Sequence, residues 1–296
     1  MTAPVEARRL TKRYGTLTAV DSLDLRVEAG EVYGFLGPNG AGKTTTLRML
    51  LGLIRPSSGE VRLFGRAPGR LDGVGALIEG PGFYPYLSGR DNLRVMARHA
   101  GVGPGRVAAV LDQVELTGRA GDRYATYSLG MKQRLGVAAA LLKDPRLVVL
   151  DEPTNGLDPA GMADMRLLVR RLGAAGCTVL LSSHLMTEVQ ELCDRVGVIA
   201  GGRLVAESTV AELRGEPGLR LVAEPLDAAA AQARSLFGMQ AVQVTDGALR
   251  LTVSPGRAAE VNAALVGAGI AVSELRADER SLEDAFLALT SGASHA

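Results

Sequence analysis

The chain has 296 residues, a length that allows about two domains, at least one of them with a substantial core. Apolar residues make up 47% of the sequence and charged residues 22%, proportions that exclude a disordered chain. The formal net charge is only +1 and the arginines are scattered, so no basic tract indicates a nucleic-acid partner.

The first 37 residues predict β-strands, because apolar and charged residues alternate over 23–27. An apolar run at 31–37 leads into a glycine-rich turn, as a buried strand does before a tight loop. The pattern then predicts a helix over 44–54, ended by Pro56, and a short strand over 58–65.

The middle of the chain changes character before the strand pattern returns. Glycine, proline and tyrosine turns alternate with short helical patterns, so we expect a helical subdomain over about residues 80–140. Apolar strands at 146–150 and 178–183 flank a predicted helix at 159–173, which indicates a parallel sheet covered on both faces. A hairpin with two glycines at its turn is predicted over 196–208.

The composition shifts near Gly215–Gly218, so we expect a large first domain at 1–215 and an accessory domain at 216–296. The elements predicted after the shift are strand 219–223, helix 226–237, strands 240–245 and 248–253, helix 256–268 and strand 270–276. This order, βαββαβ, indicates a small ferredoxin-like α+β domain. A last helix is predicted from Ser281, with Asp284 as its capping partner. The role of this second domain stays open: it is a structural lid, it stabilises a dimer, it regulates the first domain or it contacts a partner.

Residues 37–45 form a phosphate-binding loop. They match G-x-x-x-x-G-K-[ST] between an apolar strand and a helix, where backbone N–H groups and the helix N-terminus face phosphate oxygens. The residues expected to contact ATP are Gly37, Pro38, Asn39, Gly40, Ala41, Gly42, Lys43, Thr44 and Thr45. Lys43 is expected to neutralise the β- and γ-phosphates and to serve catalysis, and Thr44 to ligate Mg²⁺.

Three further residues stand at predicted strand ends, on the edge of the sheet where ligands bind. Asp151 is suited to hold Mg²⁺ through water, and Glu152 to position and polarise the attacking water. His184 ends the strand TVLLSSH, where a histidine is able to contact a γ-phosphate. The two cysteines, Cys177 and Cys193, fit no ligand or redox spacing and are expected to be inert thiols.

The order of these motifs resembles the ATP-binding subunit of ABC transporters. GPNGAGKTT is followed by YSLGM before KQR, then by LVVLDEP, NGLD and SSH, and the resemblance covers about residues 4–214. It implies an α/β P-loop NTPase fold and two ATP molecules sandwiched between two such domains. Tyr14 then corresponds to the aromatic that stacks on adenine, and Asp158 belongs to a loop that communicates across the dimer. Ser128 and Gly130 correspond to signature residues that bind the γ-phosphate held by the opposite subunit.

The sequence departs from this family at two places. The common signature is LSGGQ, and here Tyr127, Leu129 and Met131 replace three of its residues. Glu79 stands where the family carries a glutamine near the γ-phosphate. A glutamate oxygen is still able to hold Mg²⁺ or water, but its negative charge is expected to weaken ATP affinity or to alter hydrolysis.

The combination LIE, FYPYL and YSLGMKQR is similar to the antibiotic-exporting group, of bacitracin or daunorubicin resistance type. The resemblance implies an ATPase that energises a membrane exporter through ATP-driven dimer closure. No apolar run is long enough for a bilayer span, so the permease is expected on a separate multi-span chain. The second ATPase subunit is expected to be an identical copy, although a homologous chain stays open. The complex would then work at the cytoplasmic side of the membrane.

The alternative is a soluble ABC ATPase that acts on ribosomes or DNA. Such proteins carry two fused ATPase domains or a long coiled coil, whereas this sequence has one set of motifs, no sustained heptads and no basic tract. A P-loop kinase or GTPase fits less well, because NGLD is not a guanine-reading motif.

The aromatic segment Phe83, Tyr84 and Tyr86 has two interpretations. It either contacts a helix of the membrane partner or packs the insertion's own small core.

Overall fold

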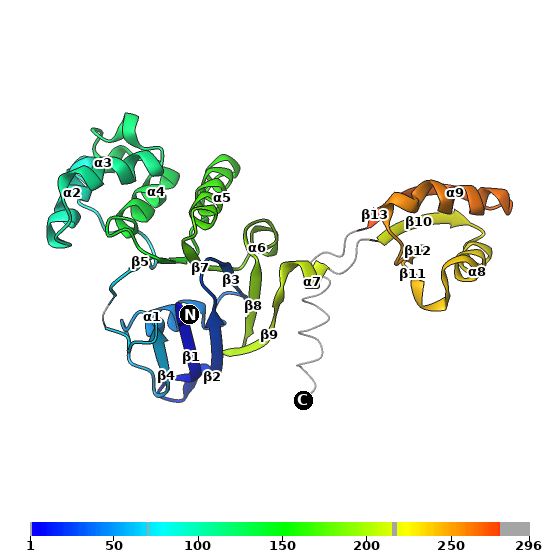
Figure 1. The fold of residues 1–296 in the computed structure, drawn as a ribbon, viewed down its shortest axis with the longest axis horizontal. Coiled ribbons are helices and arrows are strands. Elements are labelled where there is room, and N and C mark those ends of the chain that lie inside the picture. The colour runs from blue at the N-terminus through cyan, green and yellow to red at the C-terminus, as the bar shows by residue number, and fades with distance from the viewer. Residues whose placement is uncertain (1, 70, 215–217, 279–296) are drawn as a thin grey trace. The chain divides into compact units, whose positions relative to one another are not determined.

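A computed structural model describes residues 2–69, 71–214 and 218–278. The chain divides into two compact units, with the change from one to the other at Val210 and Ala211 (Figure 1). The domain boundary expected at residues 215 and 216 falls in a segment that is not described, and it stays a prediction. The helix expected from Ser281, with Asp284, also lies outside the described residues.

The first unit is built on a six-stranded sheet. Its strands, in sheet order, are β5 (Val74–Leu77), β6 (Leu147–Asp151), β7 (Thr178–Ser183), β3 (Val32–Leu36), β8 (Arg195–Ala200) and β9 (Arg203–Thr209). Neighbouring strands are parallel except β8 and β9, which form the predicted antiparallel hairpin. The predicted α/β class with a parallel sheet is therefore confirmed. The strand β5 was not predicted, because its four residues are too few to show a pattern.

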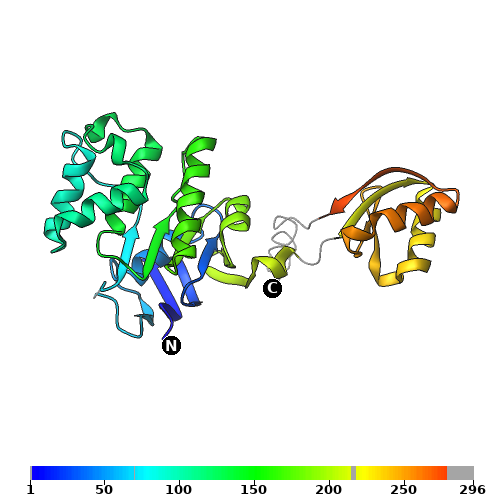
Figure 2. The same ribbon diagram turned by 45° about the horizontal axis from the view of Figure 1, so that its top comes forward.

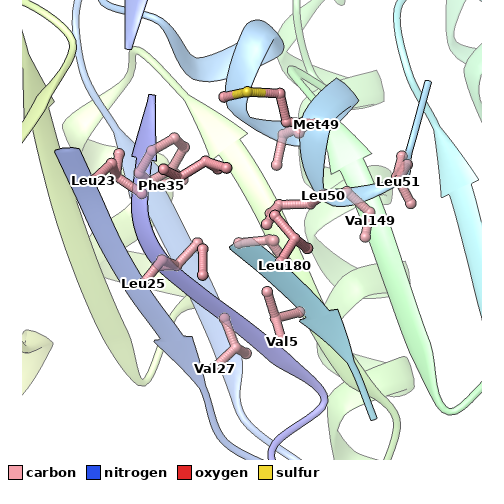
Figure 3. Packing of buried hydrophobic residues seen from close by; sticks show 14 of the residues in the cluster. Val5, Leu23, Leu25, Val27, Phe35, Met49, Leu50, Leu51, Val149 and Leu180 are labelled. Atoms are coloured by element: carbon pink, nitrogen blue, oxygen red, sulfur yellow. The ribbon is translucent and has the colours of Figure 1, made fainter. Parts of the chain in front are cut away.

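A three-stranded antiparallel sheet faces the central sheet across one helix. It consists of β2 (Leu17–Val27), β1 (Val5–Tyr14) and β4 (Ser58–Leu63), in that order. Apolar side chains of both sheets and of α1 (Lys43–Leu50) close into one core (Figure 3), which includes Val5, Leu25, Phe35, Leu50, Val149 and Leu180. The burial of these apolar side chains is the main favourable contribution to the free energy of folding here. Their close packing keeps the strand and the helix on either side of the phosphate-binding loop in fixed positions.

The helix α1 ends earlier than predicted. The sequence pattern suggests a helix over 44–54, but the structure ends it at Leu50, six residues before Pro56. Gly52 adopts a left-handed conformation (φ 71°), and its N–H donates to the carbonyl of Met49. Leu53 N–H donates to the carbonyl of Arg48, which completes a Schellman motif. A glycine in this cap, rather than the proline, therefore stops the helix.

The predicted helical insertion is present. It contains α2 (Gly89–His99), α3 (Pro104–Gln113) and α4 (Leu129–Ala140), which Figure 1 shows grouped beside the end of the central sheet. Phe83 packs edge-on against Tyr124 inside it, with ring centroids 5.2 Å apart, whereas Tyr84 and Tyr86 are exposed. The aromatic segment therefore divides between the insertion's own core and its surface.

The opposite face of the central sheet carries α5 (Pro159–Ala174) and α6 (Met186–Leu192). Alternate residues of β3 show the two faces, because Phe35 joins the core around α1 while Gly34 lies under α6. A Cβ at Gly34 would come within 2.9 Å of Val189, so glycine allows this close helix–strand approach. No helix among the described residues combines the length and the apolar character that a membrane span requires.

The second unit begins within α7 (Val210–Arg214). It contains β10 (Gly218–Glu224), α8 (Leu226–Phe237), β11 (Val242–Thr245), β12 (Ala248–Leu251), α9 (Ala258–Gly267) and β13 (Ala271–Asp278). The antiparallel sheet has the order β11-β12-β10-β13, and both helices cover one of its faces (Figure 2). This is the ferredoxin-like arrangement that the βαββαβ order predicts.

Candidate active site

The loops after β3, β6 and β7 meet at one edge of the central sheet. β7 lies between β6 and β3 and is parallel to both, so their carboxyl ends point the same way. Residues 37–45 follow β3, Asp151 and Glu152 stand at the end of β6, and His184 follows β7. Ligands of open α/β sheets bind at such an edge.

The loop 37–45 has the backbone of a phosphate cradle. Gly40 and Gly42 have left-handed φ values of 81° and 107°. A Cβ at Gly42 would lie 2.5 Å from the carbonyl oxygen of Ala19, and a Cβ at Gly37 would lie 2.4 Å from that of Ile199. Only glycine fits these two positions. The loop leads directly into α1, with Gly42 as its N-cap. The first N–H groups of a helix have no partner within the helix and are able to bind phosphate oxygens.

Lys43 is held inside this loop. Its side chain is 5% exposed, and Nζ donates to the carbonyl oxygens of Gly37 at 2.6 Å and Pro38 at 3.1 Å. Nζ also lies 3.1 Å from Oε1 of Glu152. The loop thus fixes the ammonium group between its own backbone and the carboxylate at the end of β6.

Asp151 connects two elements of the site. One of its carboxylate oxygens accepts the Thr44 hydroxyl at 2.8 Å, and the other accepts the Ser182 hydroxyl at 2.6 Å. Ser182 Oγ in turn accepts the N–H of Glu152 at 3.0 Å. Ser182 was missed at the sequence level, because a serine in an apolar strand carries no positional signal. It orients both carboxylate residues at the end of β6.

Glu152 also contacts His184, the residue that follows β7. Nδ1 of His184 lies 2.6 Å from Oε2 of Glu152. Glu152 has a φ of 48°, a left-handed backbone conformation that is strained in a residue with a side chain. Such strain persists where the surrounding contacts hold it, and here it points the carboxylate at both Lys43 and His184.

A cleft of about 360 Å³ opens over the loop. It is lined by Tyr14, Leu17, Ala19, Asn39, Gly40, Gly42, Lys43, Thr44, Thr45, Glu152 and Asn155. The Tyr14 ring is 48% exposed, and the ammonium of Lys12 lies 5.0 Å from its centroid. The cleft is therefore lined both by an aromatic ring and by the glycine-rich loop. Asn155, the first residue of the NGLD motif, also lines it, although it was not predicted as a site residue.

Ser128 and Asp158 each cap a helix near the surface. Ser128 Oγ accepts the N–H of Met131 at 3.3 Å at the start of α4, and Asp158 Oδ1 accepts the N–H of Gly161 at 3.0 Å at the start of α5. Both caps are exposed, as is Leu129, whereas Gly130 is half-buried. These residues do not line the cleft over the loop in the same chain.

Tyr127, which precedes the cap Ser128, is buried. Its side chain is 4% exposed, and its hydroxyl donates to the carbonyl oxygen of Arg119 at 2.8 Å. The unusual tyrosine of the YSLGM motif thus anchors the turn before α4. Burial raises the pKa of its phenol, which stays neutral.

Glu79 stands apart from the other proposed metal ligands. Its carboxylate forms an ion pair with Arg48 on α1, while Thr44 and Asp151 bind one another. The Glu79 backbone also has a left-handed φ of 62°. Arg48 was not predicted as part of the site, since an arginine on an exposed helix face has no distinctive pattern.

Comparisons with known proteins show which family the chain belongs to. The sequence profile of the ABC transporter family matches residues 20–155. The chain is 39% identical to the bacitracin transport ATP-binding protein BcrA of Bacillus licheniformis, over 99% of each chain. It is 38% identical to the lantibiotic transport ATP-binding protein SrtF of Streptococcus pyogenes, over 69% of this chain and 90% of that protein.

Solved structures share the fold of the first unit. The ATP-binding subunit of an ABC transporter superposes with a TM-score of 0.62 at 28% identity, over 71% of this chain and 91% of that one. The dimeric ATP-binding cassette MJ0796, bound to ADP and phosphate, superposes with a TM-score of 0.64 at 23% identity, over 70% of this chain and 99% of that one. By its full-length relatives and its fold, the chain belongs to the ATP-binding proteins of ABC transporters, and it is an ATP-hydrolysing transporter subunit.

Proposed function

We propose that this chain is the ATPase subunit of an exporter that removes an antibiotic or a related hydrophobic compound from the cell. The support is the similarity over nearly the whole chain to a bacitracin transport protein, together with that to a lantibiotic transport protein. The observation that carries the ATPase mechanism is the convergence of Lys43, Glu152 and His184 beside a glycine cradle.

The site suits Mg²⁺ bound together with ATP. The Thr44 hydroxyl and the Asp151 carboxylate, 2.8 Å apart, are hard oxygen ligands. Among the described residues no three His, Cys, Asp or Glu side chains gather into a metal site, so the other ligands would be phosphate oxygens and water. Bound there, Mg²⁺ would neutralise charge that develops on the phosphates. Glu79, which pairs with Arg48 through one carboxylate oxygen, would join this set through the other.

The chain's own residues divide the work of hydrolysis. Lys43 would bind the β- and γ-phosphates from inside the loop, with adenine against Tyr14. Glu152 would orient the attacking water and accept its proton. His184 would contact the γ-phosphate and hold the Glu152 carboxylate in position, which the 2.6 Å contact between them supports. In-line attack needs this positioning more than it needs covalent chemistry.

A second ATPase subunit would complete each site. Ser128, Gly130 and Asp158 lie at helix N-termini away from the cleft, and the exposed caps of α4 and α5 are suited to anion contact from a neighbour. We propose that an identical chain supplies Ser128 and Gly130 to the γ-phosphate, while Asp158 belongs to the loop that communicates across the dimer. Closure and reopening of the pair would then move the helical insertion.

A separate membrane permease would receive this movement on the cytoplasmic side. The exposed rings of Tyr84 and Tyr86 offer it an apolar contact with hydrogen-bonding hydroxyls. Nucleic acid is not expected as a partner.

Co-expression with the candidate permease tests the proposal. Cells that make both proteins should grow at higher bacitracin or lantibiotic concentrations than cells with either alone, and Glu152→Gln should abolish the gain. The chain should also co-purify with the permease in detergent. ATP hydrolysis without any permease association or resistance would contradict the exporter role.

A further inference from the structure

Glu188 is a buried carboxyl group next to the hydrolytic residues. It lies on α6, four residues after His184, and it is only 1% exposed. An acidic side chain this deeply buried costs free energy unless its oxygens are bound. Glu188 is not among the residues that line the cleft over the loop.

One oxygen of Glu188 fixes the turn that carries His184. Ser183 donates its hydroxyl to Oε2 of Glu188 at 2.5 Å, and Ser183 Oγ accepts the N–H of Leu185 at 3.0 Å. The carboxyl group therefore directs the hydroxyl proton to itself and leaves an oxygen lone pair for Leu185. The residues on both sides of His184 are tied together by this one hydroxyl group.

Ser183 also reaches the phosphate-binding loop. Its carbonyl oxygen accepts the N–H of Gly37 at 3.2 Å, at the point where the loop leaves β3. A shift of Ser183 would therefore move both the His184 turn and the base of the cradle.

The carboxyl group of Glu188 also lies within electrostatic reach of Glu152 and Thr154. Burial raises the pKa of its carboxyl group, the charge of Glu152 raises it further, and the side chains of Ser183, Thr154 and Arg166 lower it. Thr154 is 3% exposed and lies two residues after Glu152. Within the described residues, Oε1 of Glu188 has no hydrogen-bond partner. Glu188 is therefore bound to the turn that carries His184, and His184 in turn contacts Glu152.

We propose that Glu188 is a positioning residue for ATP hydrolysis, one that holds the His184 turn and the Glu152 segment in a fixed relation. The inference rests on the hydrolytic roles proposed for His184 and Glu152. The Nδ1–Oε2 contact between those two is 2.6 Å, so a displacement of about 1 Å lengthens it beyond the range of a hydrogen bond. Glu188 acts through its neighbours and does not touch the nucleotide.

Steady-state kinetics of the purified full-length chain test this proposal. Glu188→Ala should lower kcat by about tenfold to a hundredfold, the scale of a misplaced reacting group, and leave the Kd for ATP within about twofold. Glu188→Gln should keep more than about half of kcat, because its amide oxygen still accepts the hydroxyl of Ser183. Glu191→Gln is the matched control on α6, since Glu191 is exposed and pairs with Arg166.

Ser183→Ala gives an independent arm if Glu188→Ala folds poorly. It should lower kcat by a similar factor, and the double variant should lose no more than either single one, because both changes break one connection. Additive losses would overturn the proposal, as would a Glu188→Ala variant with normal kcat. The proposed hydrolytic mechanism is tested separately: if Glu152→Gln retains full turnover, the mechanism itself fails, whatever Glu188 does.

Discussion

The Glu152 carboxylate is held between a lysine and a histidine, because Nζ of Lys43 lies 3.1 Å from Oε1 and Nδ1 of His184 lies 2.6 Å from Oε2. Lys43 belongs to the phosphate-binding loop and His184 to the end of β7. The position of the Glu152 carboxylate therefore depends on both segments. A substitution at Glu152 is suited to separating the binding of ATP from its hydrolysis.

Glu152→Gln is expected to bind ATP normally and to turn it over at least about a hundredfold more slowly, since the base is lost while the shape is kept. Size-exclusion chromatography with Mg²⁺–ATP should then show a trapped dimer, which the unmodified chain is expected to form only briefly. Lys43→Ala is the companion variant and should lose nucleotide binding itself. Normal turnover by Glu152→Gln would refute the assignment.

Thr44→Val is expected to shift the Mg²⁺ dependence of ATPase activity to higher concentrations. The valine keeps the shape but removes the hydroxyl that Asp151 accepts at 2.8 Å, so one metal ligand is lost. Thr44→Ser retains a hydroxyl and serves as the control. Removal of Mg²⁺ with EDTA should abolish turnover in all three proteins. An unchanged Mg²⁺ midpoint in the valine variant would remove Thr44 from the metal site.

Glu79→Gln is expected to tighten ATP binding several-fold, on the scale of about 1 kcal/mol for one charge near a phosphate in a solvated site. The ion pair with Arg48 adds a condition to this prediction. Arg48→Met should weaken ATP binding in the otherwise unmodified chain, because it leaves the Glu79 carboxylate uncompensated. It should have a smaller effect in the Glu79→Gln background, where that carboxylate is absent.

Isothermal titration of the four proteins measures this coupling. Arg94→Met controls for the loss of one positive charge, since Arg94 pairs with Asp91 on α2 instead. Equal effects of Arg48→Met in both backgrounds would mean that the ion pair does not influence the nucleotide site.

The sequence predicts those parts of the site whose residues are adjacent in the chain. The loop 37–45 and the acidic pair after β6 were predicted because their residue types must stand next to one another in sequence to do their chemistry. The alternation and length of β6 and β7 likewise indicated a parallel sheet whose carboxyl ends meet.

The missed residues depend on packing between distant segments. Ser182 matters because β7 pairs with β6, and Glu188 because α6 presses its side chain against the end of β7. An acidic residue on a short helix is usually exposed, so nothing local marks Glu188 as buried. Arg48 became part of the site only through its partner, 31 residues further along the chain.

Cys177 is expected to react with maleimides slowly at neutral pH. Burial raises the pKa of its thiol to about 11, and the thiolate is the reactive form. The labelling rate should therefore keep rising about tenfold per pH unit through pH 10, whereas an ordinary thiol levels off near pH 9. Cys193 is more deeply buried and should stay unlabelled in the folded chain. Mass spectrometry of the native chain and of Cys177→Ser measures this, and rapid labelling at pH 7 would contradict it.

Gly89 and Tyr127 should show a strong dependence on each other in stability. Gly89 is the first residue of α2, and a Cβ there would lie 2.1 Å from the Tyr127 hydroxyl oxygen. Gly89→Ala gains up to about 1 kcal/mol of helix propensity but displaces a buried ring, so a net loss of about 1–2 kcal/mol is expected.

In a Tyr127→Leu background the obstacle is gone, and Gly89→Ala should then be neutral or stabilising relative to Tyr127→Leu alone. Urea unfolding followed by circular dichroism gives the four midpoints, a suitable probe because the chain has no tryptophan. The same loss in both backgrounds would show that the ring does not fill this space.

Because Tyr127 precedes the cap Ser128, Tyr127→Leu should also lower ATPase activity more than ATP affinity, since the turn before α4 would lose its anchor to the carbonyl of Arg119.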